Sequence, residues 1–207
     1  MKLTTTTNVT VDGVMQGLGG ADEDRRGGFE RGGWVGPLND TESGDYINQI
    51  YGGAAAFLFG RLTYEIFARS WGAMPDLMKH PIGVALNSRP KYVASTSLTN
   101  PKWAGTTVLT GDVAAAVRNL KTHQDGELLV PGSGVLVRWL LANDLVDQLN
   151  LITFPVVVGQ GTRLFPDSGP DIALGLVNSR TTSAGITIQN YRPAGRAEYA
   201  TSTPTRR

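Results

Sequence analysis

A strand, a tight glycine turn and a helix follow one another directly in the second half of this chain. Leu128 to Val130 is an apolar run of strand length, Pro131 to Gly134 is rich in glycine, and Val135 to Leu141 reads as a helix. A buried strand that feeds a helix in this way is typical of an α/β fold. The glycines also leave backbone N–H groups bare at the positive end of a helix, which suits a phosphate. Many α/β proteins turn like this for packing alone, so one such turn does not establish a ligand.

An upstream segment repeats the pattern and adds a basic residue. Ala54 to Phe59 is a continuous apolar run, Gly60 to Thr63 turns the chain, and apolar residues at i, i+3, i+4 and i+7 follow from Tyr64. Arg61 lies within this turn, and its planar guanidinium can bind a phosphate bidentately. Two turns that suit phosphate predict a site for a dinucleotide.

The remaining elements alternate helices with strands and end in strands alone. Further strands are expected at Thr4–Val11, Lys91–Ala94, Thr106–Leu109, Leu149–Val158, Ala173–Ser179 and Ile186–Tyr191, and further helices at Asp45–Tyr51 and after Asp112. Pro155 marks an edge or a bulge within Leu149–Val158. The stretch that contains Pro75 and Pro81 is expected to be a loop. This order predicts a mixed, mostly parallel central sheet flanked by helices, with an antiparallel C-terminal hairpin at its edge. Right-handed crossovers would bring the Gly60 and Gly132 turns to one carboxyl edge of that sheet.

The length of the chain suits one domain, expected over residues 1–192 and followed by a disordered tail over 193–207. Asp12 to Asn39 holds nine glycines and little periodicity. A loop of that length inside a compact domain is either functional or disordered. Its aromatic residues, Phe29 and Trp34, indicate that part of it packs on the rest of the protein.

Composition excludes several classes of protein. The formal net charge is +1, with no dense basic patch for nucleic acid or an acidic membrane. Zero cysteines exclude disulfides and a thiolate nucleophile, and two histidines make a metal centre an unfavoured reading. No apolar run has the roughly 20 residues of a membrane span, and the N-terminus lacks the apolar stretch of a signal peptide. The default expectation is a cytoplasmic protein that acts on a small molecule.

The two turns resemble those of a known family. The run from Gly60 to Glu65 looks like the strand-to-helix signature of the dihydrofolate reductase fold, and the run from Leu128 to Gly134 is similar to its later glycine turn. Val11–Met15, Asp144–Leu149 and Pro155–Gly161 resemble one branch of that superfamily. This branch includes the C-terminal reductase domain of the bifunctional riboflavin-biosynthesis deaminase/reductase.

The resemblance implies that NADPH binds across the carboxyl edge of the sheet. Arg61 would meet the 2′-phosphate, Thr63 the pyrophosphate, and Ser95 the phosphate on the adenosine ribose. The complete set of expected cofactor-binding residues is Gly60, Arg61, Leu62, Thr63, Ser95, Gly132, Ser133, Gly134, Val135 and Leu136. The glycine-rich segment after Asp12 corresponds to the mobile loop that closes over the nicotinamide in this fold.

Two of these assignments have simpler alternatives. Arg61 could form a surface ion pair, and Ser95 could satisfy the end of a strand. A surface pair between Glu65 and Arg69 is also expected, because they lie four residues apart on a helix.

Asp12 and Asp40 are the candidate catalytic residues. Asp12 lies where the first strand meets the glycine-rich segment, and it could act as an acid or anchor a substrate. Its alternative is a plain Asp-Gly turn, and that of Asp40 is a helix cap.

The resulting hypothesis is an NADPH-dependent reductase that transfers a hydride to a C=N or C=O bond of a small heterocycle, similar to a pteridine or a pyrimidine. One rival is a nucleotide-binding or regulatory protein that kept the fold and lost the chemistry. Another is a structural homodimer that associates through the strand from Phe154 to Val158 and the helix of Trp139.

Overall fold

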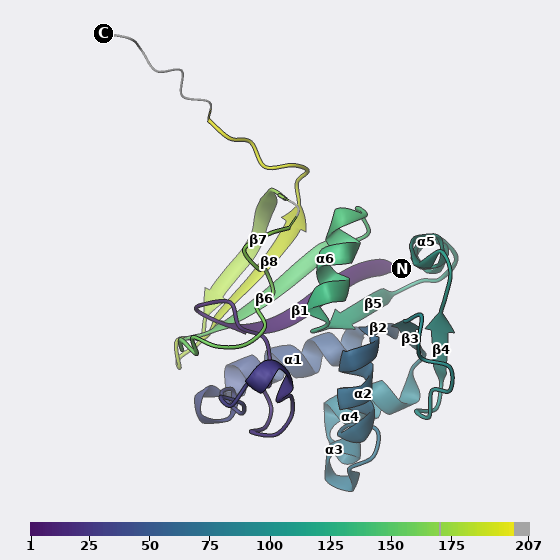
Figure 1. Ribbon diagram of the computed structural model, residues 1–207, viewed down its shortest axis with the longest axis horizontal. Coiled ribbons are helices and arrows are strands. Elements are labelled where there is room, and N and C mark those ends of the chain that lie inside the picture. The colour runs from purple at the N-terminus through teal and green to yellow at the C-terminus, as the bar shows by residue number, and fades with distance from the viewer. Residues whose placement is uncertain (170, 201–207) are drawn as a thin grey trace.

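The computed structural model, which describes residues 1–169 and 171–200, contains one eight-stranded sheet with helices on both faces (Figure 1). The strands are β1 (Lys2–Thr10), β2 (Ala56–Gly60), β3 (Lys91–Ala94), β4 (Thr106–Leu109), β5 (Glu127–Pro131), β6 (Gln148–Phe154), β7 (Leu174–Thr181) and β8 (Thr187–Pro193). The α-helices are α1 (Thr41–Gly53), α2 (Arg61–Arg69), α3 (Pro75–Lys79), α4 (Pro81–Ser88), α5 (Val113–His123) and α6 (Gly134–Ala142). Two short 3₁₀ turns, η1 (Arg26–Gly28) and η2 (Gly36–Leu38), lie between β1 and α1.

The strand order is β4-β3-β2-β5-β1-β6-β8-β7, and the first six of these strands are parallel. Strand β8 runs antiparallel to β6, and β7 pairs antiparallel with β8 at the edge. This arrangement confirms the predicted mixed sheet and its C-terminal hairpin. Strands β2 and β5 are direct neighbours, with Phe57 opposite Leu129, so the turns that follow them lie at the same edge of the sheet.

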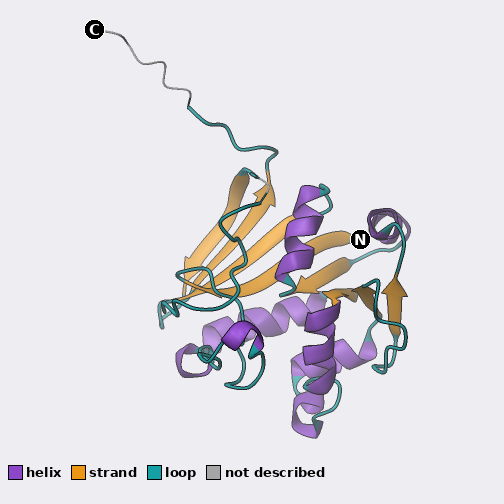
Figure 2. Ribbon diagram, viewed as in Figure 1, coloured by secondary structure: helices purple, strands orange, loops and turns teal. Residues whose placement is uncertain are grey.

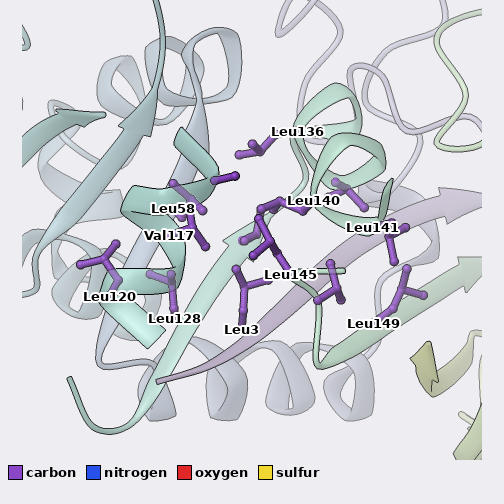
Figure 3. Packing of buried hydrophobic residues seen from close by; sticks show 14 of the residues in the cluster. Leu3, Leu58, Val117, Leu120, Leu128, Leu136, Leu140, Leu141, Leu145 and Leu149 are labelled. Carbon is purple, nitrogen blue, oxygen red and sulfur yellow. The ribbon is translucent and has the colours of Figure 1, made fainter. Parts of the chain in front are cut away.

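Both faces of the central strands are covered, which explains their unbroken apolar runs. On one face, Leu58 and Leu128 pack under α5 and α6, and Figure 3 shows the α6 leucines over Leu3 and Leu149. On the other face, Phe57 and Phe59 join a cluster with residues of α1, α2 and α4. Because neighbouring residues of a strand point to opposite faces, a single run of aromatic and aliphatic residues supplies both cores.

The stretch around Pro75 and Pro81 was wrongly expected to be a loop. Each proline is the first residue of a short helix, α3 or α4. Proline suits this position because the first N–H groups of a helix have no partner within the helix. Gly83 allows the two helices to touch, since a Cβ there would lie 1.9 Å from the carbonyl oxygen of Leu77.

Two boundaries near the C-terminus also differ from the prediction. Strand β6 ends at Phe154 instead of Val158, because Pro155 has no N–H to continue the ladder. At the other end of the hairpin, Ala194 donates to the carbonyl oxygen of Ala173, and Ala173 donates to that of Gly195. The pairing of the hairpin thus continues past Pro193 to Gly195, and residues 201–207 of the predicted tail lie outside the described part of the chain.

The glycine-rich segment is mostly loop (Figure 2), but an aromatic cluster ties it to the sheet. Phe29 and Trp34 are buried, and Trp34 meets the edge of Phe154 with ring centroids 5.5 Å apart. The Trp34 Nε1–H donates to the carbonyl oxygen of Gln16 at 2.9 Å. Phe154 and Val158, expected at a dimer interface, are buried within the chain, whereas Val157 and Trp139 are exposed.

None of the described helices is long and apolar enough to span a membrane.

The packing of Phe154 gives a prediction about the glycine-rich segment. Phe154→Ala should lower the free energy of unfolding by about 3–5 kcal/mol, because it opens a cavity in a close-packed core. It should also loosen Trp34, which would appear as a red-shifted tryptophan emission before global unfolding in a urea titration. Val157→Ala, at a side chain that is 68% exposed, is the control and should change stability by less than about 0.5 kcal/mol. An equal effect of the two variants would contradict this account of the core.

Candidate functional site

The two predicted turns meet at the carboxyl edge of the sheet and are joined by a hydrogen bond. The backbone N–H of Gly60 donates to the Ser133 hydroxyl at 3.1 Å. Thr63 also faces the second turn, since its Cγ2 lies 3.8 Å from the position that a Cβ on Gly132 would take. The ends of β2 and β5 therefore form one continuous surface.

The helices that leave these turns lack side-chain caps. Asp40 caps α1, and the Asp112 carboxylate accepts from the Ala115 N–H at the start of α5. Neither Gly60 nor Ser133, the residues before α2 and α6, places a side chain on the first turn of its helix. The positive ends of two helices are thus available to an anion at the same edge of the sheet.

The β5–α6 turn has an unusual backbone. Gly132 has φ of 56°, and Ser133 has φ of 56° and ψ of 50°, a left-handed conformation that is unfavourable for a serine. Ser133 is only 6% exposed, and its hydroxyl is held by Gly60. Such a conformation persists only where the surroundings hold it, and it concentrates at functional sites.

Helices α2 and α6 depart to opposite faces of the sheet, because α6 belongs to the core on one face and α2 to the core on the other. Neighbouring parallel strands whose connections diverge in this way open a crevice at their carboxyl ends, where α/β proteins bind ligands. Met15, from the glycine-rich segment, lies over the start of α6. A Cβ on Gly134 would lie 2.5 Å from its Sδ, so glycine permits this close approach.

Arg61 is the first residue of α2 and pairs with Glu65, its Nη1 lying 2.8 Å from Oε1. The expected alternative for Arg61, a surface ion pair, is therefore present in the structure, and the partner of Glu65 is Arg61 instead of Arg69. Both side chains of the pair are accessible, at 42% and 39% exposure. Leu62 and Val135, each in the first turn of a helix, are exposed as well.

Ser95 follows β3, the neighbour of β2, so the three predicted segments occupy three consecutive strands at one edge. Its hydroxyl accepts hydrogen bonds from the N–H groups of Ser97 at 3.2 Å and Leu98 at 3.0 Å. Ser95 thus stabilises the turn after β3, in agreement with the alternative that it satisfies the end of a strand. The structure brings the expected cofactor-binding residues together along this edge.

Asp12 fastens the end of β1 to the loop after β6. Its carboxylate accepts from the Thr10 hydroxyl at 2.6 Å and from the N–H groups of Val158 at 3.1 Å and Gly159 at 2.8 Å. Burial acts to raise the pKa of Asp12, but these hydrogen bonds outweigh it and lower the pKa to about 2. A carboxylate that is ionised at neutral pH holds no proton to donate, so Asp12 does not suit the role of an acid.

Asp40 fastens α1 to the β7–β8 hairpin. It forms a capping box with Ser43, whose N–H donates at 2.7 Å, and it accepts from the N–H of Ala184 at 3.3 Å. A hydrogen bond from the Thr182 side chain is the main cause that lowers the pKa of Asp40 to about 2. The cap reading is confirmed, and Asp40 is unsuited to proton donation for the same reason as Asp12.

A groove of about 470 Å³ between the glycine-rich segment and α2 has no counterpart in the sequence patterns. It is lined by Glu23, Asp24, Arg25, Arg26, Leu62, Glu65, Ile66 and Arg69. Its two sides lie some 40 residues apart in the chain, which is why no local motif indicates it. Met15 was likewise missed, because a lone methionine in a loop carries no signal.

Comparison with known proteins places this architecture in a family. The sequence profile of the RibD C-terminal domain matches residues 1–188. The chain belongs to the RibD C-terminal domain family. This is a family of reductase-like domains associated with riboflavin biosynthesis and NADPH binding.

This RibD C-terminal domain protein is also similar to individual proteins of known sequence or structure. The uncharacterized protein YyaP of Bacillus subtilis is 28% identical over 186 residues, which cover 86% of this chain and 87% of YyaP. A putative riboflavin biosynthesis protein from Shewanella sp. PV-4 has a TM-score of 0.70 at 18% identity, covering 94% of this chain and 99% of the other.

A pyrimidine reductase-like protein from Corynebacterium diphtheriae has a TM-score of 0.62 at 15% identity, covering 93% of this chain and 92% of the other. Acinetobacter baumannii RibD has a TM-score of 0.61 at 12% identity, covering 93% of this chain but 58% of RibD. These structures share the dihydrofolate reductase-like fold, which the two turns predicted.

The hydrogen bonds of Asp12 and Asp40 predict how stability depends on pH. A folded-state pKa near 2, below the ordinary 3.8, stabilises the protein above about pH 4, and this stabilisation is lost as the pH falls toward 2. Asp12→Asn and Asp40→Asn should therefore be less stable than the wild type at pH 6, and the difference should shrink between pH 4 and pH 2. Thermal unfolding across this range measures it.

The control for that series is Asp167→Asn, which removes one negative charge from an exposed loop position. A difference in melting temperature between wild type and Asp12→Asn that stays constant from pH 6 to pH 2 would contradict the assigned hydrogen bonds.

Proposed function

We propose that this protein is an NADPH-dependent reductase that transfers a hydride to a C=N or C=O bond of a small heterocycle. The observation that supports this most directly is the pair of uncapped helix ends at neighbouring strands, joined by the Gly60–Ser133 hydrogen bond with Arg61 beside them. Membership of a reductase-like family points in the same direction.

The residues at this edge fit a dinucleotide phosphate. The N–H groups of Gly134, Val135 and Leu136 lie in the first turn of α6 and would hold the pyrophosphate, with Thr63 facing them from α2. Arg61 is accessible and would bind the 2′-phosphate with its planar fork. Ser95 would shape the turn beside the adenosine ribose.

When bound, the cofactor supplies the hydride, and the protein orients it and excludes water. Met15 over the start of α6 and the anchored Trp34 would keep the glycine-rich segment across the crevice. Asp12 acts here as a positioning residue, because its hydrogen bonds to Val158 and Gly159 hold the neighbouring loop in place.

A nucleotide-binding protein without reductase chemistry is the second candidate. It is favoured by one observation: both predicted catalytic carboxylates, Asp12 and Asp40, are committed to structural hydrogen bonds. Oxidation of NADPH over a panel of pteridines, pyrimidines and quinones separates the candidates, since only the reductase consumes the cofactor.

Cofactor titration tests the proposal. The purified protein should bind NADPH more tightly than NADH in a fluorescence titration. Arg61→Gln should weaken NADPH binding about tenfold or more and leave NADH binding unchanged, because charge-assisted hydrogen bonds contribute about 1.5–3 kcal/mol.

The control for this variant is Arg118→Gln, which removes an exposed arginine from α5 and should bind both cofactors as the wild type does. Failure of both cofactors to bind below millimolar concentration would refute the proposal. Equal affinity for NADPH and NADH would refute the role of Arg61 alone.

A further inference from the structure

The groove between the glycine-rich segment and α2 is lined by three carboxylates, of which only Glu65 comes from α2. Glu65 pairs with Arg61 on its own helix and shares the groove with Arg26 of the glycine-rich segment. We propose that Glu65 pairs with Arg61 in the free protein and with Arg26 once the 2′-phosphate of NADPH has taken Arg61. Glu65 is then a positioning residue that fastens the outer glycine-rich segment to α2 only when the phosphorylated cofactor is bound. This inference rests on the proposed function.

The Arg61–Glu65 pair can be displaced. Its atoms are 2.8 Å apart, but both side chains are about 40% exposed and belong to one helix face at i and i+4. Exposed pairs of this kind are weak. A phosphate with nearly two negative charges attracts the same guanidinium more strongly than one carboxylate does, and it gains further from the uncapped end of α2.

Arg25 and Arg26 both line the groove on the side of the glycine-rich segment, and Arg25 pairs with Asp22. Arg26 lines the same 470 Å³ space as Glu65. The pKa of the Arg26 guanidinium is raised, first by its hydrogen bond to Asp24 and in smaller part by the negative charge of Glu65. Asp24 engages the Nε and Nη2 of Arg26, and within residues 1–169 and 171–200 no acceptor is bonded to Nη1. That nitrogen is the donor for a released Glu65.

Hydrogen bonds hold the backbone of Arg26 at the rim of the groove, so only its side chain has to move to reach Glu65. The Gln16 amide donates to the carbonyl oxygens of Asp24 at 3.1 Å and Arg26 at 2.9 Å. Gly27 and Gly28, which follow at φ of 66° and 74°, have open space around them. The chain is buried again at Phe29. The exposed turn over residues 25–28 is therefore held at both ends, and within the described part of the chain no hydrogen bond or ion pair joins it to α2.

Because Glu65 changes its partner from Arg61 to Arg26 only when the 2′-phosphate is bound, the ordering of the turn over residues 25–28 depends on that phosphate. NADH carries no such group, so it would leave the Arg61–Glu65 pair intact. NADPH would release Glu65, and the groove would then be bridged from α2 to η1. The protein would in this way close fully over the cofactor that it is proposed to use.

Hydrogen exchange followed by mass spectrometry tests the inference. Peptides covering residues 19–30 are compared in the free protein and in the protein saturated with NADPH or with NADH. NADPH should slow exchange there about two- to fivefold more than NADH does, the range expected for one exposed ion pair. In Glu65→Gln and in Arg26→Gln, the two cofactors should slow exchange equally.

Glu30→Gln is the matched control, since it removes a carboxylate from the same segment outside the groove. It should keep the difference between NADPH and NADH. Cofactor affinity is measured by fluorescence on the same samples, so that a failure to bind NADPH is distinguished from a failure of Glu65 to change its partner.

NADPH binding with no excess protection over NADH would overturn the inference and leave the proposed function standing. Retention of the excess protection in Glu65→Gln would also overturn it. Absence of NADPH binding in the wild type would overturn both.

Discussion

The hydrogen bond from the Gly60 N–H to the Ser133 hydroxyl joins the two halves of the candidate site. It is possible because β2 and β5 are parallel neighbours with core residues on both faces, so their helices must leave toward opposite sides. Ser133 joins the ends of the two strands from a left-handed backbone conformation. Arg61 follows the first of these turns directly, whereas Met15 is held over the second by its hydrogen bond to the carbonyl oxygen of Thr162.

Asp12 and Asp40 have side chains of a type used in catalysis, and in this fold both form structural hydrogen bonds. Asp12 and Asp40 both lie at or near the carboxyl edge of the sheet, and both have a pKa lowered to about 2 by hydrogen bonds. Asp12 connects β1 with the loop after β6, while Asp40 connects α1 with the β7–β8 hairpin. Each therefore connects elements that are distant in the sequence. The groove beside α2 shows the converse, since its Glu65 is accessible and is engaged by an exposed ion pair with Arg61.

Local patterns predicted much of this fold. Strands β3 and β4 occupy the residues expected of them, and the two glycine turns follow the strands that the continuous apolar runs predicted. The errors have definite causes. Pro75 and Pro81 begin helices, because proline fits the first position of a helix as readily as a loop, and local composition does not separate the two cases. The hairpin extends to Gly195 because Ala173 pairs with the chain there, a contact that polar sequence after Pro193 does not reveal.

By itself, the sequence determined the strands, the helices other than α3 and α4, and the two glycine turns. Each of these follows from spacing within some ten consecutive residues, where apolar periodicity and glycine act on the local backbone. Only the tertiary structure decided the partners of Asp12, the bond between Ser133 and Gly60, and the position of Arg26 opposite Glu65. These contacts join residues that are tens to more than a hundred positions apart, and they exist only once the sheet has brought the ends of distant strands together.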